Sequence, residues 1–145
     1  MQILLAVDGS DCSTRAAQYL AQHFNMFATP IDLYVFHVEP GIPIGLAAMQ
    51  ARALLGKEVI DQYTHSEAMK ALAPAEKLFS EAKITFRSGY RVGQPAEEIC
   101  RMAEEQRCEL VVMGSRGRGA VHGLVMGSVA MKVVAASQVP VLIVR

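Results

Sequence analysis

The chain alternates between short apolar runs and longer segments with helical periodicity. The apolar runs span residues 3–7, 31–38, 84–92, 110–113 and 139–144. They are rich in β-branched residues, and three of them are nearly continuous, as is typical of strands buried on both faces of a parallel sheet. The order β-α-β-α-β-α-β-α-β predicts an open, doubly wound α/β sheet with helices on both faces and right-handed crossovers.

Several helix boundaries can be predicted from the local sequence. Ser10 and Asp11 are suited to open a first helix, which we expect to reach about Phe27. Pro95 suits the first turn of a later helix, and Ser128 is placed to cap the last one. The apolar stripes expected to face the core are Ala16, Ala17, Leu20 and Phe24 in the first helix, and Ile99, Met102 and Ala103 after Pro95.

The crossover between the second and third runs is less regular. Residues 41–45 form a loop with proline and glycine, and the segment from about 47 to 82 contains Gly56 and Pro74. Both residue types interrupt helices, so we expect fraying near Gly56 and a kink or break near Pro74.

The third and fifth runs have the properties of edge strands. The third places Thr85, Arg87, Gly89 and Arg91 on one face, and arginine discourages pairing between sheet edges. The fifth ends in four apolar residues, 141–144. If they lie at the other edge of the sheet, another polypeptide segment must bury them.

The bulk properties of the chain restrict its class. Its 145 residues suit one domain, and 14 basic residues balance 14 acidic ones, so no overall field recruits nucleic acid or a membrane surface. The N-terminus lacks the features of a signal peptide, and no run approaches the ~18 apolar residues of a spanning helix, which predicts a cytoplasmic protein. Cys12, Cys100 and Cys108 lack metal-like spacing, so we expect reduced thiols and no metal site.

The segment that carries chemistry is the glycine-rich stretch from Gly114 to Ser128, between the fourth apolar run and the last helix. Glycines let an anion approach the backbone closely, and unpaired N–H groups at the positive end of a helix attract it. The stretch therefore predicts a phosphate-binding loop and a nucleotide-binding function.

Two common phosphate motifs do not occur. The sequence has no Gly-x-x-x-x-Gly-Lys-Ser/Thr, and its nearest dinucleotide match, Gly117-x-Gly119 followed by Gly123, is one residue too long and follows the fourth run instead of the first. The turn after the first run carries Asp8 and Asp11, whose carboxylates would repel a pyrophosphate.

The spacing that does match is Gly114-x-x-Gly117, nine residues, then Gly127-Ser128. With it the chain resembles the nucleotide-binding subclass of the universal stress protein family, whose signature is G-x-x-G-x9-G-S/T. The resemblance extends over residues 1–145, through Leu-Leu-Ala-Val-Asp-Gly-Ser near the start, Val-Gly-Gln-Pro-Ala-Glu-Glu-Ile at 92–99 and Val-Pro-Val-Leu-Ile-Val near the end. It implies one Usp domain over 1–145, with an adenine nucleotide alpha hydrolase-like fold and strand order 3-2-1-4-5.

The implied strand order places a topological switch point between strands 1 and 4, where ligands bind in open α/β sheets. The resemblance makes ATP, accompanied by Mg²⁺, the expected ligand, with AMP or ADP as alternatives. It implies that Asp8 binds the ribose and that the backbone of Val38 meets adenine. Met113 and Gly114 then line the base and sugar, and Gly117, Gly127, Ser128 and Val129 bring amides and a hydroxyl to the phosphates.

Single residues of this set have simpler explanations. Taken alone, Asp8 is typical of a turn and Ser128 of a helix N-cap, and only together with the glycines do they favour a site. Arg116 and Arg118 either pair with phosphate oxygens or are solvated loop arginines. We interpret Cys12 as an ordinary helix-face cysteine in a turn where thiols are often reactive.

The histidines also receive structural interpretations. His122 is interpreted as a loop residue, and His37 as a core or backbone-anchored residue. Because no general base, activated nucleophile or metal cluster accompanies the loop, no catalytic residue is assigned, and slow ATP hydrolysis is the most that we expect.

The sequence therefore predicts an ATP-binding universal stress protein of the cytoplasm that acts in a stress response or in nucleotide-state signalling. We expect a homodimer that pairs through Val141 to Val144, and a further protein partner that the sequence does not identify. Two alternatives remain: a dimeric interaction protein that leaves its pocket empty, and an enzyme that is a slow ATPase or transfers nucleotidyl groups.

Overall fold

The structure has the order of elements that the apolar runs predict. The computed structural model describes residues 1–27, 29–41, 53–54, 56–119 and 125–145. Within these ranges the elements are β1 (Gln2–Val7), α1 (Asp11–Gln22), the 3₁₀ turn η1 (Phe24–Met26), β2 (Asp32–Pro40), α3 (Lys57–Glu81), β3 (Phe86–Gly93), α4 (Pro95–Glu105), β4 (Leu110–Gly114), α5 (Ser128–Ala136) and β5 (Val141–Val144). Each strand overlaps one predicted run.

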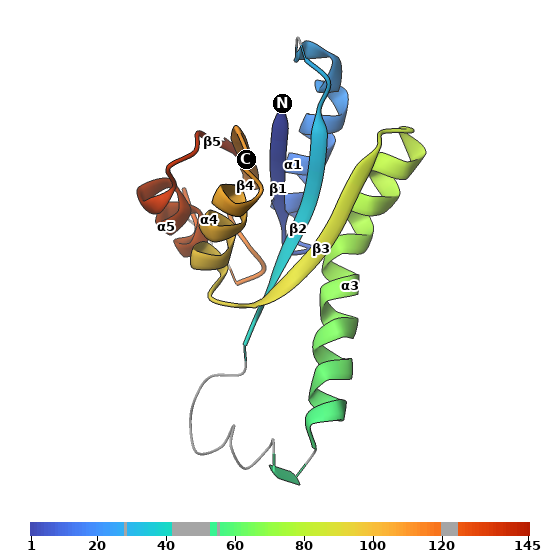
Figure 1. The fold of residues 1–145 in the computed structure, drawn as a ribbon, viewed down its shortest axis with the longest axis vertical. Coiled ribbons are helices and arrows are strands. Elements are labelled where there is room, and N and C mark those ends of the chain that lie inside the picture. Colours follow the sequence, from blue (N-terminus) through green and yellow to red (C-terminus); the bar gives the residue numbers. More distant parts are fainter. Residues whose placement is uncertain (28, 42–52, 55, 120–124) are drawn as a thin grey trace.

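The five strands form one parallel sheet in the order β3-β2-β1-β4-β5 (Figure 1). In the central strand, Leu5 lies opposite Val35 of β2 and Val112 of β4. The predicted fold class and strand order are thereby confirmed. The order reverses between β1 and β4, which makes the carboxyl ends of these two strands the topological switch point.

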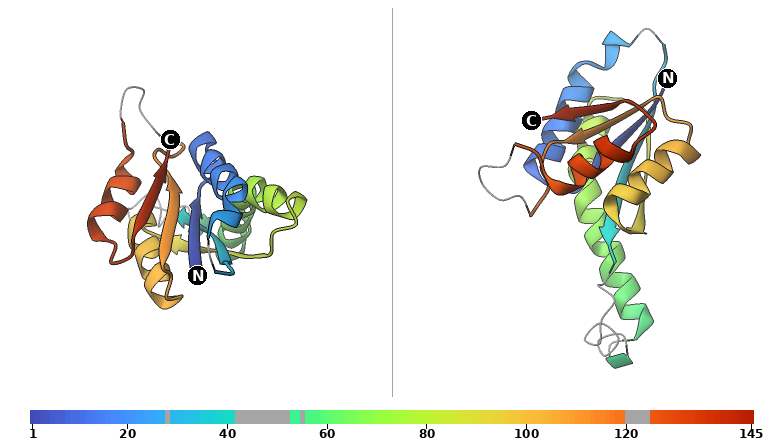
Figure 2. Two further views of the ribbon diagram at one scale, coloured as in Figure 1. Left: turned by 90° about the horizontal axis from the view of Figure 1, so that it is seen from above. Right: turned by 90° about the vertical axis from the view of Figure 1, so that its left-hand side faces the viewer.

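Alternate residues of the central strand pack toward two separate helical layers. Ile3 and Leu5 belong to a core cluster with α1 and α3, whereas Leu4 and Ala6 belong to a cluster with α4 and α5. Figure 2 shows the two pairs of helices on opposite sides of the sheet. Leu4 and Leu5 are both 0 % exposed, and burying each such side chain stabilises the fold by about 1.5–3 kcal/mol. The same strand therefore holds both layers in place.

Helix α1 begins where predicted and ends earlier. The hydroxyl of Ser10, the N-cap, accepts a hydrogen bond from a backbone N–H of the first turn at 3.2 Å. The helix ends at Gln22 instead of Phe27, and η1 follows. At the end of the helix, the backbone N–H of His23 lies 3.1 Å from the carbonyl of Tyr19, and its Nδ1 lies 2.8 Å from the same oxygen. Side-chain competition of this kind for a backbone group favours ending a helix.

Helix α3 runs unbroken through Pro74, so of the kink or break predicted there, the break is wrong. Pro74 and Lys70 are both exposed residues of the helix. On this side water can replace the N–H partner that proline withholds from the carbonyl of Lys70. Gly56 is the N-cap of the helix, with a φ of 77° that favours glycine, so it marks the helix start instead of a frayed turn. The start expected near residue 47 lies outside the described residues.

The first half of α3 projects beyond the sheet (Figure 1). Its buried side chains begin at Ala68 and continue through Ala71, Leu72, Ala75 and Phe79. Only this second half packs against the core cluster on its face of the sheet.

The two helices on the other face differ in how they begin. Pro95 occupies the first turn of α4 as predicted, and Ile99, Met102 and Ala103 are buried. Helix α5 begins at Ser128, with Gly127 as its N-cap and no side-chain capping bond. The prediction that Ser128 caps this helix is wrong, because its own backbone is already helical.

Both sheet edges carry the strands expected there. At the β3 edge, Arg87 pairs with Asp32 at 3.1 Å and lies over the ring of Tyr34, 5.3 Å from its centroid. At the other edge, the apolar strand β5 pairs only with β4 among the described residues. No helix in the described part of the chain combines the length and apolar character needed to span a membrane.

Candidate functional site

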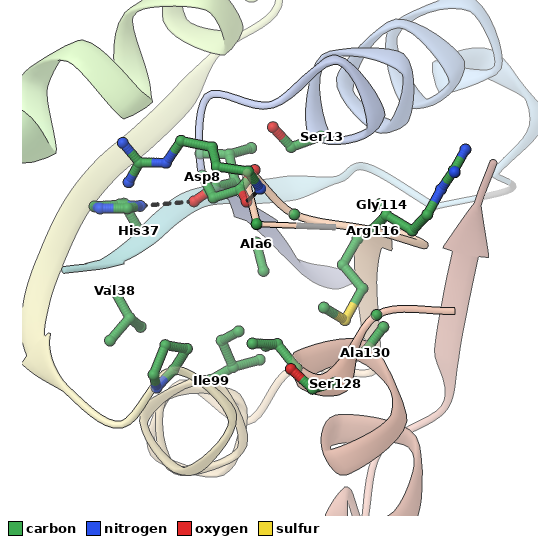
Figure 3. Close-up of a pocket in the computed structure, with 18 of the residues that line it drawn as sticks. Ala6, Asp8, Ser13, His37, Val38, Ile99, Gly114, Arg116, Ser128 and Ala130 are labelled. Atoms are coloured by element: carbon green, nitrogen blue, oxygen red, sulfur yellow. Dashed lines mark hydrogen bonds between the residues drawn. The ribbon is translucent and has the colours of Figure 1, made fainter. Parts of the chain in front are cut away.

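A cavity of about 300 Å³ opens at the carboxyl ends of β1, β2 and β4. Figure 3 shows its open centre between Asp8 and His37 on one side and Ile99 and Ser128 on the other. The volume lies at the lower end of the range for small-molecule sites, and the position is the switch point of the sheet. Both properties are those of a ligand-binding site.

One wall of the cavity is apolar. It is lined by Phe36 and Val38 of β2, Met113 of β4 and Ile99 of α4, none of which is more than 6 % exposed. These side chains also pack in the second core cluster, so the core itself fixes their positions. A rigid apolar wall of this kind suits a flat ring system.

Another part of the cavity is formed by the N-terminus of α5. Gly127, Ser128, Val129 and Ala130 line it, and the first turn carries no acidic residue. No described residue accepts a hydrogen bond from the backbone N–H of Ser128, Val129 or Ala130. Unpaired amides at the positive end of a helix dipole attract anions. The cavity thus offers an anion subsite beside an apolar wall.

Asp8 joins the two strand ends that form the switch point. Its Oδ1 accepts the backbone N–H of Ser10 at 3.0 Å, and its Oδ2 accepts the backbone N–H of Arg118 at 3.1 Å. The carboxylate therefore fixes the loop after β4 to the end of β1. Each carboxylate oxygen can accept more than one hydrogen bond, so Asp8 keeps capacity for donors such as sugar hydroxyls.

Gly114 allows β4 to pack directly against the start of α1. A Cβ atom there would lie 2.6 Å from the carbonyl carbon of Cys12 and 2.8 Å from the backbone nitrogen of Ser13. Cys12 is 7 % exposed, and Nη2 of Arg15 donates to its sulfur at 2.9 Å. These contacts agree with the interpretation of Cys12 as a packed helix-face residue.

His37 is buried, and both of its ring nitrogens have partners. Nδ1 lies 2.8 Å from the carbonyl oxygen of Val7, so the backbone-anchored interpretation is confirmed. Nε2 lies 3.0 Å from Oε2 of Glu39, and Nη2 of Arg118 lies 3.9 Å from the same oxygen. Sequence reasoning missed Glu39, although residues two apart on a strand share a face and the spacing from His37 could have indicated it.

The eight residues predicted to bind a ligand all line this one cavity: Asp8, Val38, Met113, Gly114, Gly117, Gly127, Ser128 and Val129. Arg116 and Arg118 line it too. His122 lies outside the described residues. Sequence reasoning did not assign the apolar lining residues to the site: Ala6, Phe36, Pro40, Pro95 and Ile99. Their positions at strand ends and near a helix start could have indicated them.

The polar groups of the cavity are arranged to bind a ligand with an anionic end. Arg116, Arg118 and the first residues of α5 line it after β4, and Asp8 lines it at the end of β1. Within the described ranges, no group of three or more His, Cys, Asp or Glu residues could hold a metal ion.

Comparison with known proteins gives the class to which this fold and cavity belong. The profile of the universal stress protein family matches residues 1–145. The chain is 35 % identical over 149 residues to a universal stress protein of Thermus aquaticus, covering 99 % of this chain and 97 % of that protein. It is 31 % identical over 150 residues to the universal stress protein YxiE of Bacillus subtilis, covering 99 % and 98 %. The chain belongs to the universal stress protein family.

Solved structures with lower sequence identity share the fold. The hypothetical protein MJ0577 of Methanocaldococcus jannaschii superimposes with a TM-score of 0.79 at 22 % identity, covering 99 % of this chain and 94 % of that one. A universal stress protein of Archaeoglobus fulgidus in complex with dAMP gives 0.68 at 23 % identity, covering 100 % and 98 %. A family member from Arabidopsis thaliana with AMP bound gives 0.69 at 18 % identity, covering 99 % and 90 %.

Proposed function

We propose that this protein binds an adenine nucleotide in the cavity, with ATP and its accompanying Mg²⁺ as the ligand and AMP or ADP as alternatives. The observation that carries the proposal is the N-terminus of α5, whose amides from Ser128 to Ala130 line the cavity beside the apolar wall. A nucleotide joins a flat ring to an anionic group in the same way. The relatives bound to dAMP and AMP support this class of ligand.

Each part of the ligand has a matching part of the cavity in this proposal. Adenine lies against the apolar wall, near the backbone of Val38, and the ribose hydroxyls donate to Asp8. Met113 and Gly114 line the base and the sugar. The phosphates lie at the N-terminus of α5 and along the glycine loop, near Gly117, Gly127, Ser128 and Val129.

We further propose that the chain acts as one cytoplasmic domain in a stress response or in nucleotide-state signalling, as a homodimer with a further protein partner. The edge strand β5 supports the dimer, because its outward N–H and C=O groups can pair antiparallel with those of a second copy about a two-fold axis. Met131 and Val134 of α5 are 52 % and 48 % exposed, so this helix also carries apolar side chains that a second copy could cover.

Titration calorimetry and thermal unfolding with Mg-ATP test the proposed ligand. At a hundredfold excess over Kd, binding should stabilise the fold by about 2.7 kcal/mol. For a chain of this size that corresponds to a rise in Tm on the order of 5–10 °C. Mass spectrometry of the ligand released from gently purified protein identifies which nucleotide is retained.

The outcome separates the proposal from its alternatives. If millimolar Mg-ATP, ADP and AMP produce neither heat nor a shift in Tm, the cavity is not a nucleotide site, and an interaction protein with an empty pocket is favoured. Steady release of phosphate from bound ATP would instead indicate a slow ATPase.

A further inference from the structure

Arg118 is held at the cavity in two different ways. Its backbone N–H donates to Oδ2 of Asp8 at 3.1 Å, which fixes its main chain between Gly117 and Gly119. Its side chain is 47 % exposed, and Nη2 lies 3.9 Å from Oε2 of Glu39, at the limit of an ion pair. The backbone is therefore anchored, and the guanidinium can change partners.

Glu39 is held more firmly by His37 than by Arg118. Oε2 of Glu39 lies 3.0 Å from Nε2 of His37, a residue that is 1 % exposed and whose Nδ1 lies 2.8 Å from the carbonyl of Val7. Glu39 stays with His37, and Arg118 is the member of the group that can leave.

Acidic residues of three elements lie near Arg118. They are Asp8 at the end of β1, Glu39 on β2 and Glu67 on α3. The hydrogen bond from Lys70 is the largest cause that lowers the pKa of Glu67, and the charge of Arg118 adds a small contribution in the same direction. Lys70 Nζ lies 2.8 Å from Glu67, so that carboxylate already has a cation. Glu39 is the carboxylate that competes most directly for Arg118.

Resting on the proposed function, we propose that Arg118 makes nucleotide affinity depend on the charge of the phosphates, and that Glu39, positioned by His37, competes with those phosphates for the guanidinium. The exchange replaces a 3.9 Å contact with charge-assisted hydrogen bonds to phosphate oxygens, for which the planar guanidinium is suited. Adenosine has no phosphate, so neither Arg118 nor Glu39 alters its affinity. The two residues are specificity determinants for the charged end of the ligand.

Calorimetric titrations of the full chain with adenosine, AMP and ATP test this exchange. Mg²⁺ is chelated, so that the charge of the ligand rises from adenosine to ATP. The variants are Arg118→Gln, Arg118→Lys and Glu39→Gln. The matched controls are Arg107→Gln and Glu104→Gln, whose side chains are exposed at the end of the sheet opposite to the cavity.

Arg118→Gln should weaken the binding of ATP about tenfold and that of AMP by a smaller factor, and it should leave the binding of adenosine unchanged. Arg118→Lys should have an intermediate effect. Glu39→Gln should tighten the binding of ATP about threefold, and this gain in affinity should be smaller at high salt. Both controls should bind all three ligands as the parent does.

Other results overturn the inference. Equal weakening of adenosine and ATP by Arg118→Gln would mean that Arg118 only supports the fold of the site. Weaker ATP binding by Glu39→Gln would contradict the competition. If the parent binds ATP and Arg118→Gln binds it equally well, this inference fails while the proposed function stands, and if the parent binds no nucleotide with or without Mg²⁺, both fail.

Discussion

A Cβ atom at Gly117 would lie 2.6 Å from Oδ2 of Asp8. That oxygen already accepts the backbone N–H of Arg118 at 3.1 Å, so it cannot move away without losing the bond. The loop after β4 reaches the end of β1 because residue 117 has no side chain. Glycine at this point of the motif is therefore required by the contact with Asp8 as well as by the proposed approach of phosphate.

Gly117→Ala should displace Asp8 and weaken Mg-ATP binding about tenfold or more, since a hydrogen bond to a charged group contributes about 1.5–3 kcal/mol. Titration calorimetry measures the change. Gly119, which also lines the cavity, gives the matched control. A Cβ there has no atom of the described residues within 4 Å, so Gly119→Ala should bind Mg-ATP as the parent does. Equal affinities of the two variants would contradict a role for the contact between Gly117 and Asp8.

Gly127→Val should abolish nucleotide binding. A Cβ there meets Cα of Arg116 at 3.3 Å and the carbonyl oxygen of Ser115 at 3.5 Å, and the two further methyl groups of valine crowd the N-terminus of α5. Gly127→Ala adds only the Cβ and should have a smaller effect. The melting temperature of each ligand-free variant is the control for folding. If a folded valine variant binds Mg-ATP as well as the parent does, the phosphates lie elsewhere.

The register of β5 indicates which backbone groups are available to a second copy. The N–H of Val111 donates to the carbonyl of Pro140 at 2.9 Å, and alternation in a parallel ladder then directs the N–H of Leu142 toward β4 and that of Ile143 outward. Ile143→Pro should therefore weaken the dimer and leave the monomer folded, whereas Leu142→Pro should also lower its thermal stability.

Light scattering at micromolar concentration measures this dimer. Ile143→Asp offers a second route, because it places an unpaired charge at this edge and should shift the measured mass toward that of the monomer. Ile143 also packs against the second core cluster, so the melting temperature of this variant is the control for folding. A monomeric parent would rule out the interface. If both variants at Ile143 remain dimeric, the dimer forms through another face of the protein.

Burial raises the pKa of the Cys108 thiol to about 11, although the nearby charge of Arg87 opposes part of the shift. The ordinary thiol value is 9.0, so above that pH the unfolded chain loses this proton before the folded chain does. The free energy of unfolding should then fall between about pH 9 and pH 11, by roughly 2–3 kcal/mol from this group. Urea unfolding across that range measures the slope, which should be shallower in Cys108→Ala. An unchanged slope would contradict the shift.

The sheet could be predicted because its central strands are buried on both faces, which leaves nearly continuous apolar runs such as Ile3 to Val7 in the sequence. The glycines of the loop could be predicted because a position in close contact with backbone atoms accepts few residue types other than glycine. The predicted break at Pro74 is wrong because the rule that proline interrupts helices takes no account of solvent exposure. On the exposed side of α3 the missing backbone hydrogen bond is tolerated. The spacing of Glu39 from His37 could have indicated that these two residues share a face. The contact between Glu39 and Arg118 could not be predicted, since it depends on how side chains from two distant segments turn toward each other.

The projecting half of α3 gives this helix a gradient of local stability. The side chains of Lys57, Glu58 and Val59 are exposed, whereas Leu72 and Phe79 are 0 % exposed. Opening the first turns exposes little new apolar surface, but opening the last turns disrupts the core. Amide hydrogen exchange should accordingly be fast at the start of the helix and slow toward its end, so that the helix can unwind from Lys57 while the cavity at the switch point keeps its shape.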